Sequence, residues 1–394
     1  MGPITFLTYL SVILLIGIVS TLISRKFKIP NILFLLFAGI IIGNISYKSQ
    51  PLIWFPQIFL TTIAILALAL IVFDASSRFK LSQFDALSTY AIKLSLIFLF
   101  LNIVFLTIFT IKLFQIIPVS VALIFATLMS GTSPDAVMFM LKSTKPKISQ
   151  LLEIESIINT PLVVLLPFII LDFIRRVNLN YILSGFIEQI GPFLQQFVTG
   201  IGSGILIALI IFKIMKKKYS ETLSPLAIIT SVIMAYILAE NLGGNGVLAV
   251  TTLGLFFGNV YFTHKLQLKE ISSFFVNSLE ILVFVLIGII IKFPLNYYFI
   301  LKSLLLFMTY LIVRYISVTW SLKSLDLSLR EKIFITLNAQ KGIAVAVVAF
   351  SLTTINLFGL QTILNLTLLF MLYSIILSTF ALKFSKYFVG FDVK

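Results

Sequence analysis

Thirteen apolar runs follow one another along this chain, and each is about as long as a helix that crosses a bilayer. A spanning helix needs about 20 predominantly apolar residues. The chain is 60% hydrophobic and 11% charged, whereas soluble domains average about 45–50% apolar and about 25% charged residues. We therefore predict an all-α, multi-pass membrane protein of about 13 helices. The predicted spans are 3–23, 29–46, 56–74, 86–111, 118–142, 149–171, 192–214, 223–240, 246–263, 272–291, 298–320, 330–355 and 361–382.

The basic residues fall mainly on one side of these spans. The chain has 29 lysines and arginines and a net charge of +15, which could indicate nucleic-acid binding. Most of these residues, however, lie in short loops that share one side, such as 142–147 and 213–218. Because basic loops favour the cytoplasm, we predict a cell-membrane protein with its N-terminus outside and its C-terminus inside. An odd number of spans agrees with this, since it requires the two ends to lie on opposite sides. The expected partner is membrane lipid, and no nucleic acid is expected.

The chain has no cysteine and one histidine, His264. Disulfides, thiolate metal sites and cysteine nucleophiles are therefore excluded, and one histidine cannot build a multi-histidine metal site. No segment reads as a phosphate-binding loop or a nucleophile triad. We expect no enzyme, no cofactor, and no metal beyond a transported monovalent cation.

A glycine pattern occurs twice. Residues 39–44 read Gly-Ile-Ile-Ile-Gly-Asn and residues 254–259 read Gly-Leu-Phe-Phe-Gly-Asn, in the second and ninth spans. Helices seven positions apart run in opposite directions, as in the inverted repeats of secondary transporters. The alternative is a coincidence of helix-packing glycines. The predicted single transmembrane unit, 1–394, contains repeat one at about 3–171, a linker helix at about 192–214 and repeat two at about 223–382.

The same offset pairs two spans that are interrupted near their centres. The span 118–142 contains Gly131 and Pro134, and the span 330–355 contains Asn338–Gly342. Proline removes a backbone donor and clashes with the preceding helical turn. Broken helices in corresponding places of two repeats indicate a transport site. We therefore predict that these discontinuous helices, the fifth and the twelfth, cross at the centre of the fold.

Asp135 directly follows Pro134 in the middle of an apolar span. A carboxylate in hydrocarbon is costly and usually marks an ion path or a proton relay. Burial disfavours its charged form, so a proton competes there with a cation. The structural alternative is an N-cap for the second half of the broken helix.

The sixth span carries two polar pairs at i, i+4 spacing, Glu155 with Asn159 and Ser156 with Thr160. Residues four apart share a helical face, so we interpret Glu155 as a protonatable group that faces the fifth span. The alternative is a carboxylate held in a structural ion pair. Glu153 is predicted to point elsewhere, near the surface and solvated.

Two further charged residues lie close to the predicted site. Lys341 is the only cation at the centre of the twelfth span, and a buried ammonium needs a partner, for which Glu155 and Asp135 are the candidates. Asp74 ends the third span and could line a funnel that attracts cations, although a solvated helix end explains it as well.

Taken together, these segments resemble monovalent cation:proton antiporters of the NhaP and eukaryotic sodium–proton exchanger type. The resemblance covers nearly the full length, and it implies thirteen helices, a core domain with crossed broken helices, a dimerising interface domain and elevator-like alternating access. The segments that carry it are 29–43, 73–74, 132–137, 155–159, 254–259, 286–288 and 341–342.

The departures from this family fall at the ion site. Ser133 stands where the family usually has an aspartate, Thr160 replaces a second aspartate, and Lys341 replaces an arginine beside Gly342. Both of the usual ion-binding aspartates are thus replaced, and Asp135 appears two places after the first.

The leading hypothesis is a secondary antiporter that exchanges protons for Na⁺ or K⁺ as a homodimer. Asp135 and Glu155 would alternate between proton and cation, and Lys341 would balance charge. The alternatives are a same-fold transporter of another solute, such as an organic anion, and a non-transporting membrane sensor. Neutral oxygens would come from Thr132, Ser133, Ser156, Asn159 and Thr160.

Overall fold

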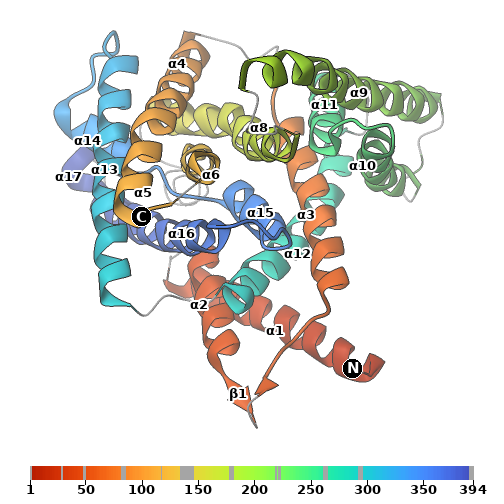
Figure 1. Ribbon diagram of the computed structural model, residues 1–394, viewed down its shortest axis with the longest axis horizontal. Coiled ribbons are helices and arrows are strands. Elements are labelled where there is room, and N and C mark those ends of the chain that lie inside the picture. Colours follow the sequence, from red (N-terminus) through yellow and green to blue (C-terminus); the bar gives the residue numbers. More distant parts are fainter. Residues whose placement is uncertain are drawn as a thin grey trace.

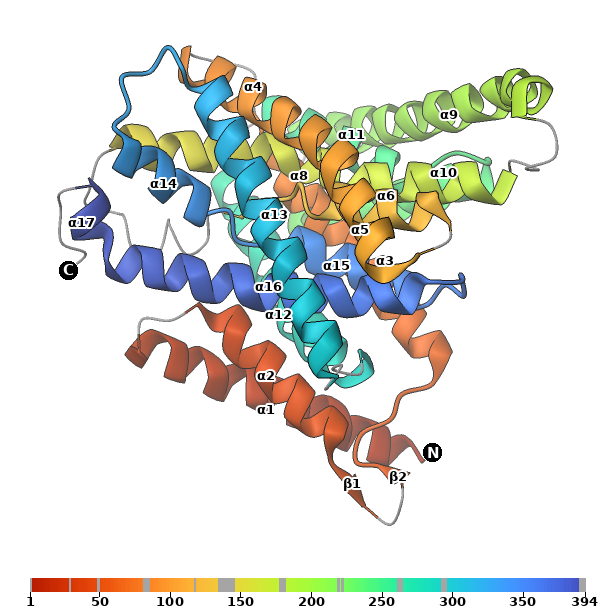
Figure 2. The ribbon, with the colours of Figure 1, turned by 60° about the vertical axis from the view of Figure 1, so that its left-hand side comes forward.

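The computed structural model of the chain describes residues 2–27, 30–47, 50–80, 86–116, 118–133, 146–176, 182–217, 220, 223–260, 265–291 and 296–389. Pro134, Asp135 and His264, which the sequence analysis singled out, lie outside these ranges. The described chain is a bundle of helices with one short hairpin near the N-terminal end (Figures 1 and 2).

The elements follow the predicted spans in order. They are α1 (Pro3–Phe27), α2 (Asn31–Asn44), β1 (Ser46–Tyr47), β2 (Gln50–Pro51), α3 (Gln57–Ser77), α4 (Ala86–Leu101), the π-helical η2 (Asn102–Leu106), α5 (Thr107–Phe114), α6 (Val119–Leu128), α8 (Pro146–Arg176), α9 (Ile182–Lys217), α10 (Leu223–Asn241), α11 (Gly246–Asn259), α12 (Lys265–Ile290), α13 (Tyr297–Ser321), α14 (Leu329–Leu337), α15 (Ile343–Leu352), α16 (Leu360–Lys383) and α17 (Ser385–Val389).

The membrane prediction is confirmed within the described ranges. Nine helices are long and apolar enough to cross a bilayer, and four apolar helices, α2, α6, α11 and α15, are shorter. Each of the thirteen predicted runs contains helix. Helices satisfy every backbone group internally, which a segment in hydrocarbon requires. The sidedness of the two ends stays a prediction.

Two helix pairs show the symmetry of an inverted repeat. α2 packs along α12, and α11 packs along α3. Counted along the thirteen predicted spans, α2 and α12 are spans two and ten, and α11 and α3 are spans nine and three. Span two corresponds to span nine, and span three to span ten, so both correspondences have the same offset of seven. The repeated glycines lie in both contacts: a Cβ on Gly39 would collide with the backbone of Val285, and one on Gly254 would lie 2.7 Å from the Phe73 carbonyl oxygen. The glycine pattern therefore serves helix packing and also marks the repeat.

Replacing Gly39 by alanine is expected to destabilise the fold by about 1–3 kcal/mol, the usual cost of overpacking a tight contact. The added methyl group would meet the backbone of α12, which cannot move aside as a side chain can. Gly202→Ala is the matched control, because a Cβ on that glycine of α9 meets nothing within 4 Å. Thermal unfolding of the two variants in detergent measures the difference. Equal melting temperatures would contradict the close approach of α2 and α12.

Candidate functional site

The two helix breaks meet directly. The first break follows α6, and its Ser133 amide donates a hydrogen bond of 2.9 Å to the carbonyl oxygen of Gln340, which lies in the break between α14 and α15. Gly131 allows this approach, since a Cβ there would lie 2.8 Å from the Val345 side chain. The predicted crossing of the interrupted helices is thus confirmed up to Ser133. Pro134 and the rest of the fifth span lie outside the described residues.

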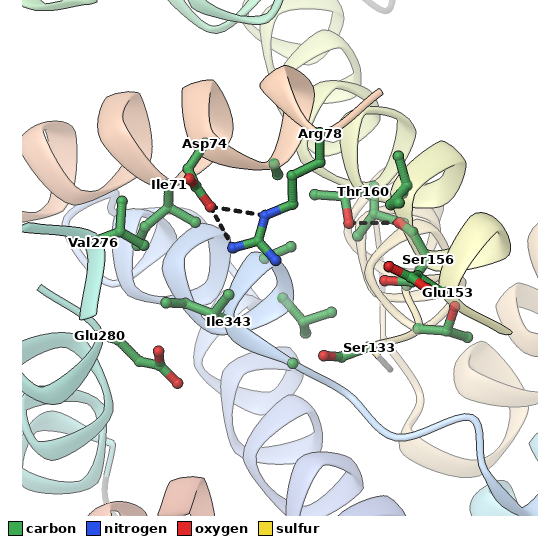
Figure 3. A pocket seen from close by; sticks show the side chains of 18 of the residues that line it. Ile71, Asp74, Arg78, Ser133, Glu153, Ser156, Thr160, Val276, Glu280 and Ile343 are labelled. Atoms are coloured by element: carbon green, nitrogen blue, oxygen red, sulfur yellow. Dashed lines mark hydrogen bonds and ion pairs between the residues drawn. The ribbon is translucent and has the colours of Figure 1, made fainter. Parts of the chain in front are cut away.

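A cavity of about 520 Å³ lies beside this crossing (Figure 3). Its walls come from the end of α3, the first break, one face of α8, the middle of α12 and the start of α15. The polar and charged residues that line it are Asp74, Arg78, Lys80, Thr132, Ser133, Glu153, Ser156, Thr160, Asn277 and Glu280.

The face of α8 that lines the cavity carries Glu153, Ser156 and Thr160. Their spacing of i, i+3 and i+7 places them along one side of a helix. The Thr160 hydroxyl donates a hydrogen bond of 2.8 Å to the Ser156 carbonyl oxygen. Ser156 and Thr160 therefore share one face of the helix, as their spacing predicted. Glu153 points away from Glu155, as predicted, but it is half-buried in the cavity wall.

Glu155 lies on a different side of α8. Glu155 is two residues after Glu153, so on a helix of 3.6 residues per turn its side chain points about 200° around the helix axis from that of Glu153. The Glu155 carboxylate accepts hydrogen bonds from both terminal nitrogens of Arg314, at 2.5 and 2.8 Å. Both side chains are fully buried, and Glu155 is absent from the cavity lining. This is the geometry of the structural ion pair that the sequence offered as the alternative.

Asn159 forms hydrogen bonds to the first break. Its amide group donates hydrogen bonds of 2.7 Å to the Ser130 carbonyl oxygen and 3.2 Å to the Thr132 hydroxyl. Asn159 is 1% exposed and does not line the cavity, whereas Thr132 does. The two predicted pairs of the sixth span thus have different surroundings. Ser156 and Thr160 line the cavity, while Glu155 and Asn159 bond to α13 and to the first break.

Lys341 is fully buried in the second break. Its ammonium donates hydrogen bonds to the carbonyl oxygens of Met129 (2.6 Å) and Gly131 (2.7 Å) and to the Tyr310 hydroxyl (2.6 Å). The expectation that Glu155 is its partner is wrong, because that carboxylate is bound to Arg314. The ammonium instead lies at the carbonyl end of α6, where a helix dipole favours positive charge.

Asp74 lines the cavity at the end of α3, as the funnel hypothesis requires, but it is already bonded. Its Oδ2 accepts hydrogen bonds from the Arg78 side chain at 3.0 and 2.6 Å, and the Ser273 hydroxyl donates to its Oδ1 at 3.5 Å. Asp74 is only 3% exposed, so the alternative of a solvated helix end does not describe it. Figure 3 shows the Arg78 guanidinium bonded to Asp74 beside the cavity.

Sequence reasoning missed Glu153 and Arg78 as cavity residues, and it assigned no role to Glu280 or Arg314. A helical projection of residues 153–160 would have placed Glu153 with Ser156 and Thr160. The sequence carries no comparable signal for Arg314, which reaches Glu155 across 159 positions of chain.

Known proteins resemble this chain over most of its length. The Na(+)/H(+) antiporter NhaH of Halobacillus aidingensis is 27% identical, with 95% of this chain and 96% of that protein covered. The K(+)/H(+) antiporter NhaP2 of Shewanella sp. (strain ANA-3) is 25% identical over 62% of this chain and 42% of that protein. A solved structure of the sodium proton antiporter MjNhaP1 from Methanocaldococcus jannaschii at pH 8 shares the fold, with a TM-score of 0.76, 22% identity, and coverage of 98% of this chain and 99% of that chain. The model of the transmembrane sodium/hydrogen exchanger family matches residues 10–385, so the chain belongs to the sodium/hydrogen exchanger family.

Proposed function

We propose that this protein is a secondary antiporter that exchanges protons for Na⁺ or K⁺ across the membrane by alternating access. It acts as a transporter and not as an enzyme. The observation that carries the proposal is the meeting of two helix breaks beside a cavity lined by carboxylate and hydroxyl oxygens. Family membership and the antiport activities in the relatives' names support it.

The cavity offers the ligands that an alkali cation needs. Hard cations prefer oxygen ligands, and Thr132, Ser133, Ser156 and Thr160 bring hydroxyl groups to the cavity wall. In this proposal Asp135, two residues after Ser133, adds a protonatable carboxylate. An anionic solute is a poorer fit, because the three carboxylates of Asp74, Glu153 and Glu280 outnumber the basic side chains of Arg78 and Lys80 on the same walls.

The remaining predicted residues support the site in this proposal. Lys341 balances the carbonyl end of α6, and Glu155 and Asn159 fix α8 against α13 and against the first break. The cavity wall includes Arg78 and Lys80. They follow the third span, and with the N-terminus outside this position lies on the predicted cytoplasmic side. We therefore assign the described conformation to an inward-facing state.

The proposal also includes the predicted arrangement in the cell. The chain is a single transmembrane unit of the cell membrane, with its N-terminus outside and its C-terminus in the cytoplasm. Repeat one (about 3–171) and repeat two (about 223–382) flank the linker helix (about 192–214), and two copies form a homodimer surrounded by lipid.

Proton flux in proteoliposomes tests the exchange. Vesicles that contain the purified protein and an internal pH dye are given Na⁺, K⁺, Li⁺ or choline outside. We expect at least one alkali ion to drive proton movement and choline to drive none. In protein-free vesicles we expect the internal pH to stay unchanged with every cation. Absence of alkali-driven flux from correctly folded protein, tested with either sign of the pH gradient, would overturn the proposal.

A further inference from the structure

The cavity face of α8 holds a carboxylate with no partner in the described part of the chain. Glu153 lines the cavity, and no hydrogen bond or ion pair joins its side chain to a described residue. The other acidic side chains near the crossing differ: Asp74 is bonded to Arg78, and Glu155 is bonded to Arg314. Glu153 is therefore the α8 carboxylate that is available to a ligand in the cavity.

A second, independent feature lies one turn along the same face. Ser156 is only 6% exposed, yet it lines the cavity, and its hydroxyl has no hydrogen-bond partner among the described residues. Because Ser156 lines the cavity, a ligand bound there can satisfy this hydroxyl. Figure 3 shows Ser156 next to Glu153 on the cavity side, with Glu280 across the cavity.

The spacing turns these groups into a short row of oxygens. A helix rises about 1.5 Å per residue, so Ser156 lies about 4.5 Å and Thr160 about 10.5 Å along the axis from Glu153. The Thr160 hydroxyl uses its proton on the Ser156 carbonyl oxygen, which leaves its own oxygen lone pairs as acceptors. Thr132 and Ser133 of the first break line the same cavity.

We propose that Glu153, and not Glu155, is the α8 carboxylate that takes the exchanged ions, with the Ser156 hydroxyl as a neutral ligand and the Thr160 hydroxyl as a separate polar contact further along the row. This inference rests on the proposed antiport. The ionised carboxylate binds one alkali ion, and the protonated carboxyl binds none. Arrival of the cation releases the proton to the cavity, and reprotonation of Glu153 releases the cation.

Glu153→Gln tests the assignment in the proteoliposome assay. The variant keeps the shape but cannot take up or release a proton at this position, and we expect exchange to fall by at least about tenfold, which the loss of one hydrogen bond to a charged group already costs. Its melting temperature should stay unchanged, because the carboxylate makes no bond with a described residue. Glu153→Asp should retain exchange with a displaced pH profile. Glu270→Gln is the matched control, on the exposed face of α12, and should exchange as the wild type does.

The wild-type protein offers a test that needs no variant. A hydrophobic carbodiimide modifies protonated carboxyl groups, and mass spectrometry locates the modified residue. We expect Glu153 to be modified, and Na⁺ or K⁺ to slow that reaction while choline does not. Modification of Glu153 at the same rate with and without the alkali ions would overturn the assignment.

The failures of the two proposals are distinguishable. If the wild type exchanges ions and Glu153→Gln exchanges them equally fast, the assignment of Glu153 is wrong and the antiport stands. If the wild type shows no alkali-driven proton flux, the antiport itself fails, and the assignment fails with it.

Discussion

Replacing Arg314 by methionine is expected to destabilise the protein by about 3–5 kcal/mol, the cost of leaving one partner of a buried ion pair uncompensated. The Glu155 carboxylate is fully buried and accepts both of its ion-pair hydrogen bonds from Arg314. The guanidinium also lies 4.7 Å from the centre of the Phe98 ring, a cation–π contact that the substitution removes. A large fall in melting temperature, or loss of monodisperse protein in detergent, measures the effect.

The double variant Glu155→Gln/Arg314→Met is the control for this prediction. It removes both charges of the buried pair, and we expect it to recover most of the stability that Arg314→Met loses, since well-packed neutral residues can replace a buried pair. We also expect it to exchange ions, because Glu155 does not line the cavity. A stable double variant without any exchange would show that Glu155 takes part in transport.

Replacing Lys341 by methionine is the second change with a large expected effect. The ammonium donates three hydrogen bonds, to two carbonyl oxygens of the first break and to Tyr310. Hydrogen bonds to charged groups contribute about 1.5–3 kcal/mol each, so we expect a loss of several kcal/mol and of exchange. Because Met129 and Gly131 then keep buried carbonyl oxygens without this cation, the crossing of the two breaks loses its main connection.

Lys341→Arg is the matched control. Arginine keeps the positive charge and can donate several hydrogen bonds, and the resembling antiporters usually have arginine at this position. We expect this variant to fold and to keep measurable exchange. A Lys341→Met protein that melts at the wild-type temperature would show that the ammonium does not hold the crossing together.

The helices and the two breaks were predictable from the sequence because their causes are local. An apolar run of sufficient length must form a helix in hydrocarbon, and Gly131 and Asn338–Gly342 lie where the described helices are interrupted. The repeated glycines also pointed to close helix contacts, since each pair lies where two helices approach closely.

The partners of the charged groups were not predictable, because they depend on tertiary packing. Glu155 and Arg314 are 159 positions apart, and Lys341 is satisfied mainly by backbone carbonyls, which every residue carries. The cavity face of α8 is set by its contacts with α3, α4, α6 and α15. Those contacts decide that Glu153 and not Glu155 lines the cavity, although both lie on the same helix.

The pH dependence of the apparent KM for the alkali ion is the most direct test of antiport through a shared carboxylate. Initial rates are measured in proteoliposomes over a range of cation concentrations at a series of pH values. If H⁺ and the cation compete for one carboxylate, the apparent KM rises as the pH falls, toward about tenfold per pH unit once that group is mostly protonated, and saturating cation restores the rate. An apparent KM that stays constant across the pH series would contradict the sharing of one site by the two ions.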